Sequence, residues 1–330
     1  MKYVLALFFF LAIYSSNAQV LQQRAVRLMG SRFDITIVAK DTVAADAYID
    51  TVVAEVTRIE NLISDWRPQT QISEVNRNAG IRPVKVDKEV FELTERALYL
   101  SRITGGAFDI SFAAMDRIWK FDGSMSEMPS PEAIKKSVKK IGYQNILLDK
   151  VKGTIFLKEE GMKIGFGALG EGYAADKCRE LMIGKGVQAG IVNGSGDMNT
   201  WGRHPDGNKW KIGVTNPIDN NELFAVLPLE NEAAVTSGSY EKYVVFNDKR
   251  YAHIINPKTG YPVSGLSSVT VLGPDAEFAN GLSTSIMVLG KKKGLKLLKA
   301  FPRYRAILVD DKGRVRATKN LNIDINSQLE

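Results

Sequence analysis

A glycine-rich stretch in the middle of the chain carries a pattern associated with dinucleotide chemistry. Within KIGFGALGEGYAADK (163–177), Gly165, Gly167 and Gly170 have the G-x-G-x-x-G spacing of a turn that presents pyrophosphate to a helix N-terminus. Glu171 would stand at that helix start, where a carboxylate repels phosphate unless a cation lies between them. A nicotinamide oxidoreductase is therefore one reading of the loop, and a phosphate ligand held through a cation is another.

A second stretch offers oxygen ligands for such a cation. In ANGLSTS (279–285), Asn280, Ser283 and Thr284 stand three and four positions apart, so a helix would direct them toward one spot. Neutral side-chain oxygens and backbone carbonyls suit Mg²⁺, which keeps water and substrate phosphate as its other ligands. The spacing predicts a magnesium site on this helix face.

Three further stretches combine turn-forming residues with an acid or a histidine. TGGAFDISF places Asp109 after a glycine pair, NGSGDMNTWG places Asp197 after small residues, and AHIINPKTGYPVSG holds His253 in a turn rich in proline and glycine. The imidazole titrates near neutrality, so His253 is the candidate for proton transfer. The alternative is that His253 only fixes its turn.

The elements that must position these residues are helices and strands in mixed order. Helical spacing of apolar residues predicts helices over 44–64, 88–106, 171–186, 277–290 and 291–301. Alternation and short apolar runs predict strands within 25–39, 145–166, 188–197, 210–217, 224–229, 233–240, 243–247 and 267–273, with a closing hairpin over 305–318. Because strands and helices do not strictly alternate, the sequence favours an α+β fold over a doubly wound parallel sheet, which counts against the nicotinamide reading.

The composition and charge of the chain indicate a globular protein and argue against a nucleic-acid partner. The chain has 330 residues, of which 45% are hydrophobic, enough for a sizeable core. The net charge of +7 comes from scattered lysines and arginines, which predicts no nucleic-acid surface. The one cysteine, Cys178, lies in a predicted helix and is expected to be a core thiol.

The N-terminus predicts export. Lys2 precedes a short apolar run and the small residues of SSNA, the pattern of a signal peptide cleaved after Ala18. We expect residues 1–18 to be removed and 19–330 to form one exported, periplasmic domain, with no cysteine for a lipid anchor and no later transmembrane segment. Free nicotinamide cofactors are scarce in that location, a second argument against the oxidoreductase.

Together these stretches resemble the ApbE family of FAD:protein FMN transferases, from about Met29 to about Gly290. The matching segments are MGS (29–31), SDWRPQTQISEVN (64–76), GAFD (106–109), GFGALGEGYAAD (165–176), SGD (195–197), SGSYEK (237–242), HIINPKTGYP (253–262) and ANGLST (279–284). Each is weak alone, but GAFD and the His-to-Pro run are specific in combination. The G-x-G-x-x-G spacing is then accidental.

The resemblance implies a single domain of mixed sheets with flanking helices. Its implied activity is Mg²⁺-dependent transfer of FMN from FAD to a threonine hydroxyl of an exported or membrane acceptor protein, with release of AMP. The implied metal ligands are the carbonyl of Ala168 with Asn280, Ser283 and Thr284. The implied FAD contacts are Met29, Trp66, Ala107, Phe108, Asp109, Gly165, Glu171 and Ile255, and His253 is the implied proton carrier.

Three positions depart from the family pattern. Gly165 replaces its usual aspartate, Glu171 its usual lysine, and Asn280 its metal-binding aspartate. These departures leave a catalytically weak FAD-binding protein open as an alternative to the transferase. A second alternative is a metal-dependent FAD pyrophosphatase, in which water replaces the threonine.

Overall fold

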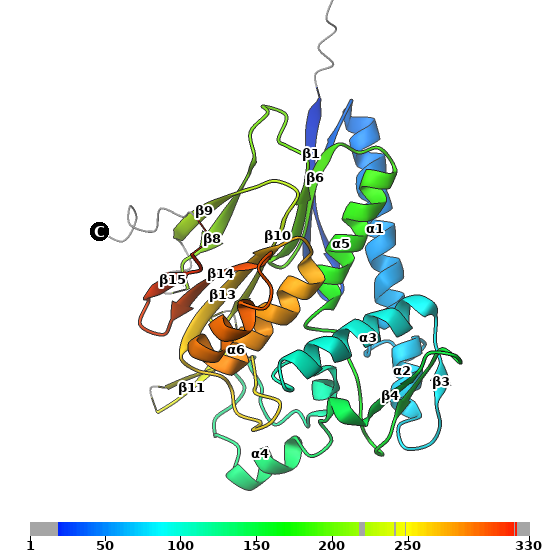
Figure 1. The fold of residues 1–330 in the computed structure, drawn as a ribbon, viewed down its shortest axis with the longest axis vertical. Coiled ribbons are helices and arrows are strands. Elements are labelled where there is room, and N and C mark those ends of the chain that lie inside the picture. Colours follow the sequence, from blue (N-terminus) through cyan, green and yellow to red (C-terminus); the bar gives the residue numbers. More distant parts are fainter. Residues whose placement is uncertain (1–18, 218–221, 241, 248, 320, 322–330) are drawn as a thin grey trace, which may run out of the picture.

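An eight-stranded sheet forms the centre of the molecule (Figure 1). The computed structural model describes residues 19–217, 222–240, 242–247, 249–319 and 321, so the predicted signal peptide lies outside it. In spatial order the strands are β1 (Val20–Leu28), β2 (Ser31–Ala39), β6 (Ala189–Gly194), β7 (Asp197–Trp201), β10 (Ala233–Gly238), β13 (Leu266–Gly273), β14 (Arg305–Asp310) and β15 (Val315–Ala317). All neighbouring pairs are antiparallel, which confirms the α+β class and excludes a parallel dinucleotide-binding sheet around the glycine loop.

Three helices cover one face of this sheet. They are α1 (Thr42–Ile63), α5 (Gly170–Gly184) and α6 (Ala276–Leu298), which contact the strands in that order across the sheet. Helix α1 shows how the sequence produces this layer, because its buried residues Ile49, Val52, Val56 and Ile59 recur every three or four positions. The resulting core lies between the helices and the sheet.

A hairpin covers part of the opposite face. It consists of β8 (Trp210–Thr215) and β9 (Leu223–Leu229). Along β10, Val235 faces the helical layer while Ala234 packs against the hairpin, as successive side chains of a strand must. The central strands are therefore buried on both faces.

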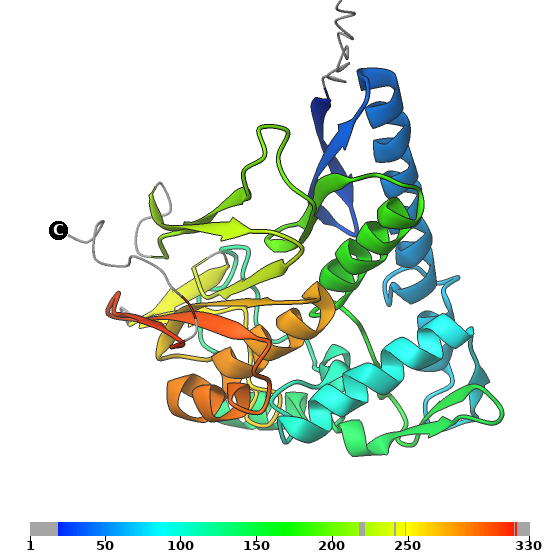
Figure 2. The same ribbon diagram turned by 45° about the horizontal axis from the view of Figure 1, so that its top comes forward.

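A second layer lies beyond the lower ends of α1 and α5 (Figure 2). It contains α2 (Gln71–Arg77), α3 (Lys88–Ile103), α4 (Pro131–Ser137), the 3₁₀ turns η1 (Ile110–Ala114) and η2 (Tyr143–Asn145), and the small sheet β3 (Val84–Lys85), β5 (Thr154–Leu157) and β4 (Ile146–Asp149). The hairpin β11 (Tyr243–Phe246) and β12 (Lys249–Ala252) packs toward α4.

Two glycines with left-handed backbone set element boundaries, one of which the sequence did not predict. The strand predicted over 25–39 is a hairpin, because Met29 and Gly30 have φ angles of 52° and 79° and reverse the chain between β1 and β2. The two helices predicted over 277–290 and 291–301 are confirmed, because α6 consists of two helical segments joined by a kink at Gly290, where φ is 73°. In both places the left-handed backbone sets the boundary.

The single cysteine and the described helices agree with the remaining sequence expectations. Cys178 is fully buried, and burial raises the pKa of its thiol, so its role is that of a core side chain. Within the part of the chain that the structure describes, no helix combines the length and apolarity that a membrane crossing requires.

Candidate active site

A cavity of about 1140 Å³ lies where the main sheet, α5, α6 and the η1 segment meet. Its size is at the upper end of small-molecule sites and allows a ligand with two ring systems. The predicted site residues that line it are Trp66, Ala107, Phe108, Asp109, Gly165, Ala168, Glu171, His253, Ile255, Asn280 and Thr284. Residues distant in the sequence are thus brought to one place.

Two predicted residues, Met29 and Ser283, do not line the cavity. The backbone N–H of Met29 donates to Glu60 at 3.2 Å, and its side chain packs under the start of α5, while the adjacent Gly30 and Ser31 face the cavity. Ser283 is fully buried, and its hydroxyl bonds to the hydroxyl of Ser237 at 2.8 Å. Their positions suit a supporting role behind the cavity wall.

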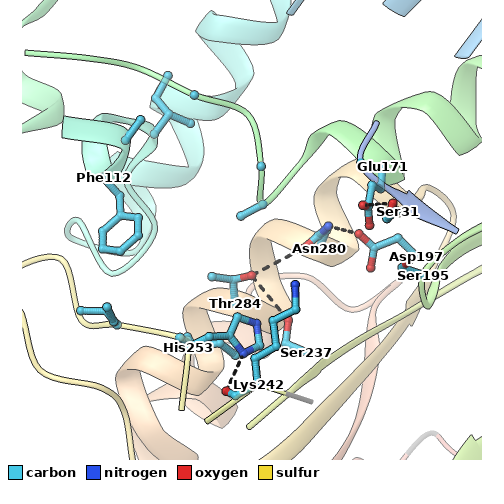
Figure 3. Close-up of a pocket in the computed structure, with 18 of the residues that line it drawn as sticks. Ser31, Phe112, Glu171, Ser195, Asp197, Ser237, Lys242, His253, Asn280 and Thr284 are labelled. Carbon is cyan, nitrogen blue, oxygen red and sulfur yellow. Dashed lines mark hydrogen bonds between the residues drawn. The ribbon is translucent and has the colours of Figure 1, made fainter. Parts of the chain in front are cut away.

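A polar cluster occupies the wall that α6 and the main sheet share (Figure 3). Asn280 donates from Nδ2 to a carboxylate oxygen of Asp197, and Thr284 donates to Asn280 Oδ1 at 3.4 Å. An ionised carboxylate only accepts hydrogen bonds, so it fixes which end of the amide faces Asp197. Asp197 reaches this point because Ser195 and Gly196, with φ angles of 49° and 101°, turn the chain between β6 and β7.

The donor atoms of this cluster fit Mg²⁺. Ala168 lines the cavity, and among the described residues no N–H or O–H donates to its carbonyl, which leaves that oxygen free for a cation. Asn280 and Thr284 supply neutral oxygens, and Asp197 supplies the one carboxylate at their side. No group of three His, Cys, Asp or Glu side chains meets anywhere in the described ranges, so a soft or nitrogen-liganded metal is not indicated there.

Glu171 stands at the first turn of α5, on the cavity wall near Asp197 (Figure 3). Its Oε1 accepts a hydrogen bond of 2.5 Å from the hydroxyl of Ser31, which follows the β1–β2 turn. This bond joins the N-terminus of α5 to the main sheet. The carboxylate of Glu171 thus lines the cavity as an acidic group.

The GAFD segment forms the wall beside η1. Gly105 and Gly106 adopt φ angles of 60° and 78°, which ends α3 and turns the chain into the cavity. Asp109 then caps η1 by accepting hydrogen bonds from Ser111 at 2.8 Å and from the backbone N–H of Tyr143 at 2.9 Å. Burial raises the pKa of the Asp109 carboxyl, and these bonds oppose that shift.

His253 lines the cavity close to Lys242 (Figure 3). Its backbone N–H donates to the Lys242 carbonyl at 2.9 Å, and its Nδ1 lies 3.3 Å from the same oxygen. A carbonyl can only accept, so the proton belongs on Nδ1 and the lone pair on Nε2. Burial lowers the pKa of His253, so the imidazole is neutral at pH 7 and can take up a proton.

Several cavity residues were not among those singled out from the sequence. They are Asp65, Arg117, Ser237 and Lys242, of which Arg117 stacks over the ring of Trp66 at 3.8 Å from its centroid. Asp65, Ser237 and Lys242 lie inside segments that the sequence resemblance covered, beside Trp66 and within the SGSYEK run. Arg117 lies in an irregular segment, where neither periodicity nor spacing indicates which way a side chain points.

Comparison with known proteins gives consistent matches. The model of the ApbE family matches residues 29–308. A FAD:protein FMN transferase of Klebsiella pneumoniae is 30% identical over 314 residues, which cover 94% of this chain and 93% of the relative. One of Treponema pallidum is 28% identical over 314 residues, with 90% of this chain and 87% of the relative covered.

Solved structures show the same fold. The ApbE protein of Thermotoga maritima superposes with a TM-score of 0.82 at 28% identity, covering 91% of this chain and 97% of that one. The apo flavinyl transferase ApbE of Pseudomonas stutzeri superposes with a TM-score of 0.79 at 27% identity, covering 91% of this chain and 95% of that one.

Proposed function

Because this chain belongs to the ApbE family, as the sequence resemblance predicted, and its curated relatives are transferases, we propose that it transfers FMN from FAD to a threonine hydroxyl of an acceptor protein and releases AMP. The observation that carries the proposal is the common cavity, which Asn280, Thr284, Ala168 and His253 all line. A cation site beside a base is the arrangement that phosphoryl transfer to a hydroxyl requires.

We assign Mg²⁺ to the oxygens of Ala168, Asn280 and Thr284, with Asp197 supplying the nearby negative charge. When bound there, the ion would neutralise charge on the pyrophosphate of FAD. The chain itself holds these oxygens in place through two serines. The hydroxyl of Ser237 hydrogen-bonds to the hydroxyl of Thr284, and the buried Ser283 hydrogen-bonds to Ser237 and to the backbone carbonyl of Asn280. Ser283 thus acts behind the cation site, in our proposal, without contacting the ion.

His253 supplies the base in the proposed reaction. The acceptor hydroxyl attacks the phosphorus that carries the flavin nucleotide, the bond from that phosphorus to AMP breaks, and Nε2 of His253 takes the hydroxyl proton. The Lys242 carbonyl supports this role because it holds the proton of the neutral ring on Nδ1. Trp66, Ala107, Phe108, Asp109, Gly165, Glu171 and Ile255 are proposed to surround FAD.

A product analysis tests this function against its hydrolytic alternative. The purified protein is incubated with FAD and Mg²⁺, with and without an acceptor carrying a threonine, and FMN and AMP are separated by chromatography. We expect AMP to appear with the acceptor and little free FMN to accompany it. Equal amounts of free FMN and AMP without acceptor would instead identify a pyrophosphatase, and no AMP in either case would indicate a binding protein.

We further propose that the protein is exported to the periplasm. The support is the sequence from Lys2 to Ala18, which has the charge and apolar run of a signal peptide. N-terminal sequencing of protein recovered from the periplasm should begin near Gln19. An intact Met1 in that fraction would contradict the proposal.

A further inference from the structure

Asp65 is an acidic residue that lines the cavity and has no role in the proposed reaction. It follows the end of α1, is half-buried and lines the cavity beside Trp66. Its own backbone N–H donates a hydrogen bond to the carboxylate, and no other residue in the described part of the chain does so. Burial raises the pKa of Asp65, and this hydrogen bond and the positive charges of Arg117 and Lys163 oppose that shift. A carboxylate with room for a further donor thus lies in the wall of a ligand cavity.

Gly165 makes room for this carboxylate. A Cβ atom at position 165 would lie 3.1 Å from both Cγ and Oδ2 of Asp65, and 3.1 Å from Cβ of Ala113. The backbone N–H of Gly165 donates to the Ile110 carbonyl at 3.0 Å, so the loop cannot easily move away. The φ angle of Gly165 is not in the left-handed region, and space is therefore the reason for glycine here.

The same place corresponds to one of the departures from the family pattern. Where the pattern has an aspartate at position 165, this chain has glycine, and the carboxylate of Asp65 approaches from the neighbouring segment. Negative charge is thus supplied to nearly the same point from a different backbone position.

The surroundings of Asp65 indicate a flat ligand with a donor at its edge. Arg117 covers one face of the Trp66 ring, yet Trp66 is 69% exposed, which is unusual for so large an apolar side chain, and its other face offers a surface for an aromatic ring. A ring held beside this indole presents its edge to the adjacent carboxylate. Since an ionised carboxylate only accepts, the edge must carry an N–H group.

We propose that Asp65 accepts a hydrogen bond from the imide N–H of the isoalloxazine ring of FAD and so positions the flavin half of the substrate. The assignment rests on the proposed function, which places FAD in this cavity. The imide is the one N–H of the oxidised isoalloxazine ring, and the amino group of adenine is the other ring donor in FAD. Asp65 is a positioning residue in this account, with no part in breaking the pyrophosphate bond.

The test compares riboflavin with 3-methylriboflavin, which lacks the imide proton, by fluorescence titration in EDTA. We expect the wild-type protein to bind riboflavin roughly ten-fold more tightly, as a charge-assisted hydrogen bond would give. Asp65→Ala should bind both flavins with equal affinity. Glu127→Gln removes an exposed acid outside the cavity and should retain the discrimination, which controls for net charge.

A reciprocal exchange tests the spatial argument. Asp65→Gly combined with Gly165→Asp returns the carboxylate from the other backbone position and should restore the preference for riboflavin. A folded exchange variant that binds both flavins equally would overturn the argument from Gly165.

Three other outcomes would overturn the assignment. If the wild-type protein binds riboflavin and 3-methylriboflavin equally, the imide contact is contradicted while the proposed function stands. A loss of ADP affinity in Asp65→Ala, with riboflavin unaffected, would assign the carboxylate to adenine instead. Wild-type protein that binds neither flavin nor FAD would refute the proposed function together with this assignment.

Discussion

The side-chain amide of Asn280 donates a hydrogen bond to the carboxylate of Asp197, 83 residues earlier in the chain (Figure 3). Helix α6 has an amide at position 280, and the adjacent strand β7 presents a carboxylate beside it on the same wall. In our proposal Asp197 supplies the negative charge near the metal site.

Asn280→Asp should make the protein depend more strongly on Mg²⁺. Two carboxylates would then face one another, which raises the free energy of the metal-free state and favours a cation between them. We expect the Mg²⁺ dissociation constant to fall roughly ten-fold by calorimetry. Thr284→Val, which keeps the side-chain shape and removes an oxygen, should weaken Mg²⁺ binding. An unchanged titration for both variants would exclude α6 as the metal site.

Glu171→Lys should improve FAD binding when no metal is present. The carboxylate of Glu171 lies in the cavity, held by Ser31, and repels a pyrophosphate that no cation screens. In EDTA we expect the variant to bind FAD about ten-fold more tightly than wild type and to gain less from added Mg²⁺. Ser31→Ala removes the hydrogen bond to Glu171 Oε1 without changing the charge of the carboxylate and serves as control. Equal FAD affinities of wild type and Glu171→Lys in EDTA would show that Glu171 does not face the phosphates.

The rate of transfer should fall at acidic pH as His253 takes up a proton. Burial lowers the pKa of this imidazole below its ordinary value of 6.5, so the neutral base persists to a lower pH than in water. The single-turnover rate should therefore reach half its maximum below pH 6.5. His253→Gln should lower this rate roughly 10²–10⁴-fold and leave FAD affinity unchanged. A variant rate that still falls with the wild-type midpoint would assign the titration to another group.

The same shift predicts a pH dependence of stability. The unfolded chain binds the histidine proton more tightly than the folded chain, so this group's contribution to the free energy of unfolding is present above pH 6.5 and is lost as the pH falls toward the folded pKa. Urea titrations across this range should show a smaller dependence in His253→Gln than in wild type. Identical pH profiles for the two proteins would argue that the pKa of His253 is not lowered by folding.

Asp176→Ala should destabilise the fold without touching the cavity. This carboxylate on α5 accepts hydrogen bonds from the backbone N–H groups of Ala276 at 2.8 Å and Glu277 at 2.9 Å, where α6 begins. Removing it leaves two helix N–H groups unpaired, so we expect a loss of about 2–4 kcal/mol in urea unfolding. Glu180→Ala, on the exposed side of α5, should change stability by less than about 0.5 kcal/mol. A loss below about 1 kcal/mol for Asp176→Ala would show that other groups satisfy the α6 N-terminus.

The sequence predicted much of this architecture because local signals and tertiary structure agree there. Helical spacing located α1, α3 and α5, and the i, i+4 relation of Asn280 and Thr284 predicted the face they share. The β1–β2 hairpin was missed because Met29 in the left-handed region is not a strong turn signal.

The parts of the cavity that the sequence did not predict depend on packing between distant segments. The contact between Asp65 and Gly165 joins residues 100 positions apart, and neither has a local pattern that indicates the other. Likewise, Ser283 lies on the predicted helix face, yet tertiary packing buries it completely behind Ser237. Spacing along a helix predicts the direction in which a side chain points, whereas the extent of its burial depends on the residues that pack over it.

The measurement that tests the central claim most directly is covalent flavinylation of an acceptor, read as in-gel fluorescence after denaturation. Purified protein is mixed with FAD, Mg²⁺ and an acceptor carrying a candidate threonine, and parallel reactions use the Thr→Val acceptor and the His253→Gln enzyme. We expect a fluorescent acceptor band with wild-type components, and no band with the altered acceptor or in EDTA. A fluorescent band that persists with the Thr→Val acceptor, or none with any threonine-bearing acceptor while FAD is consumed, would contradict it.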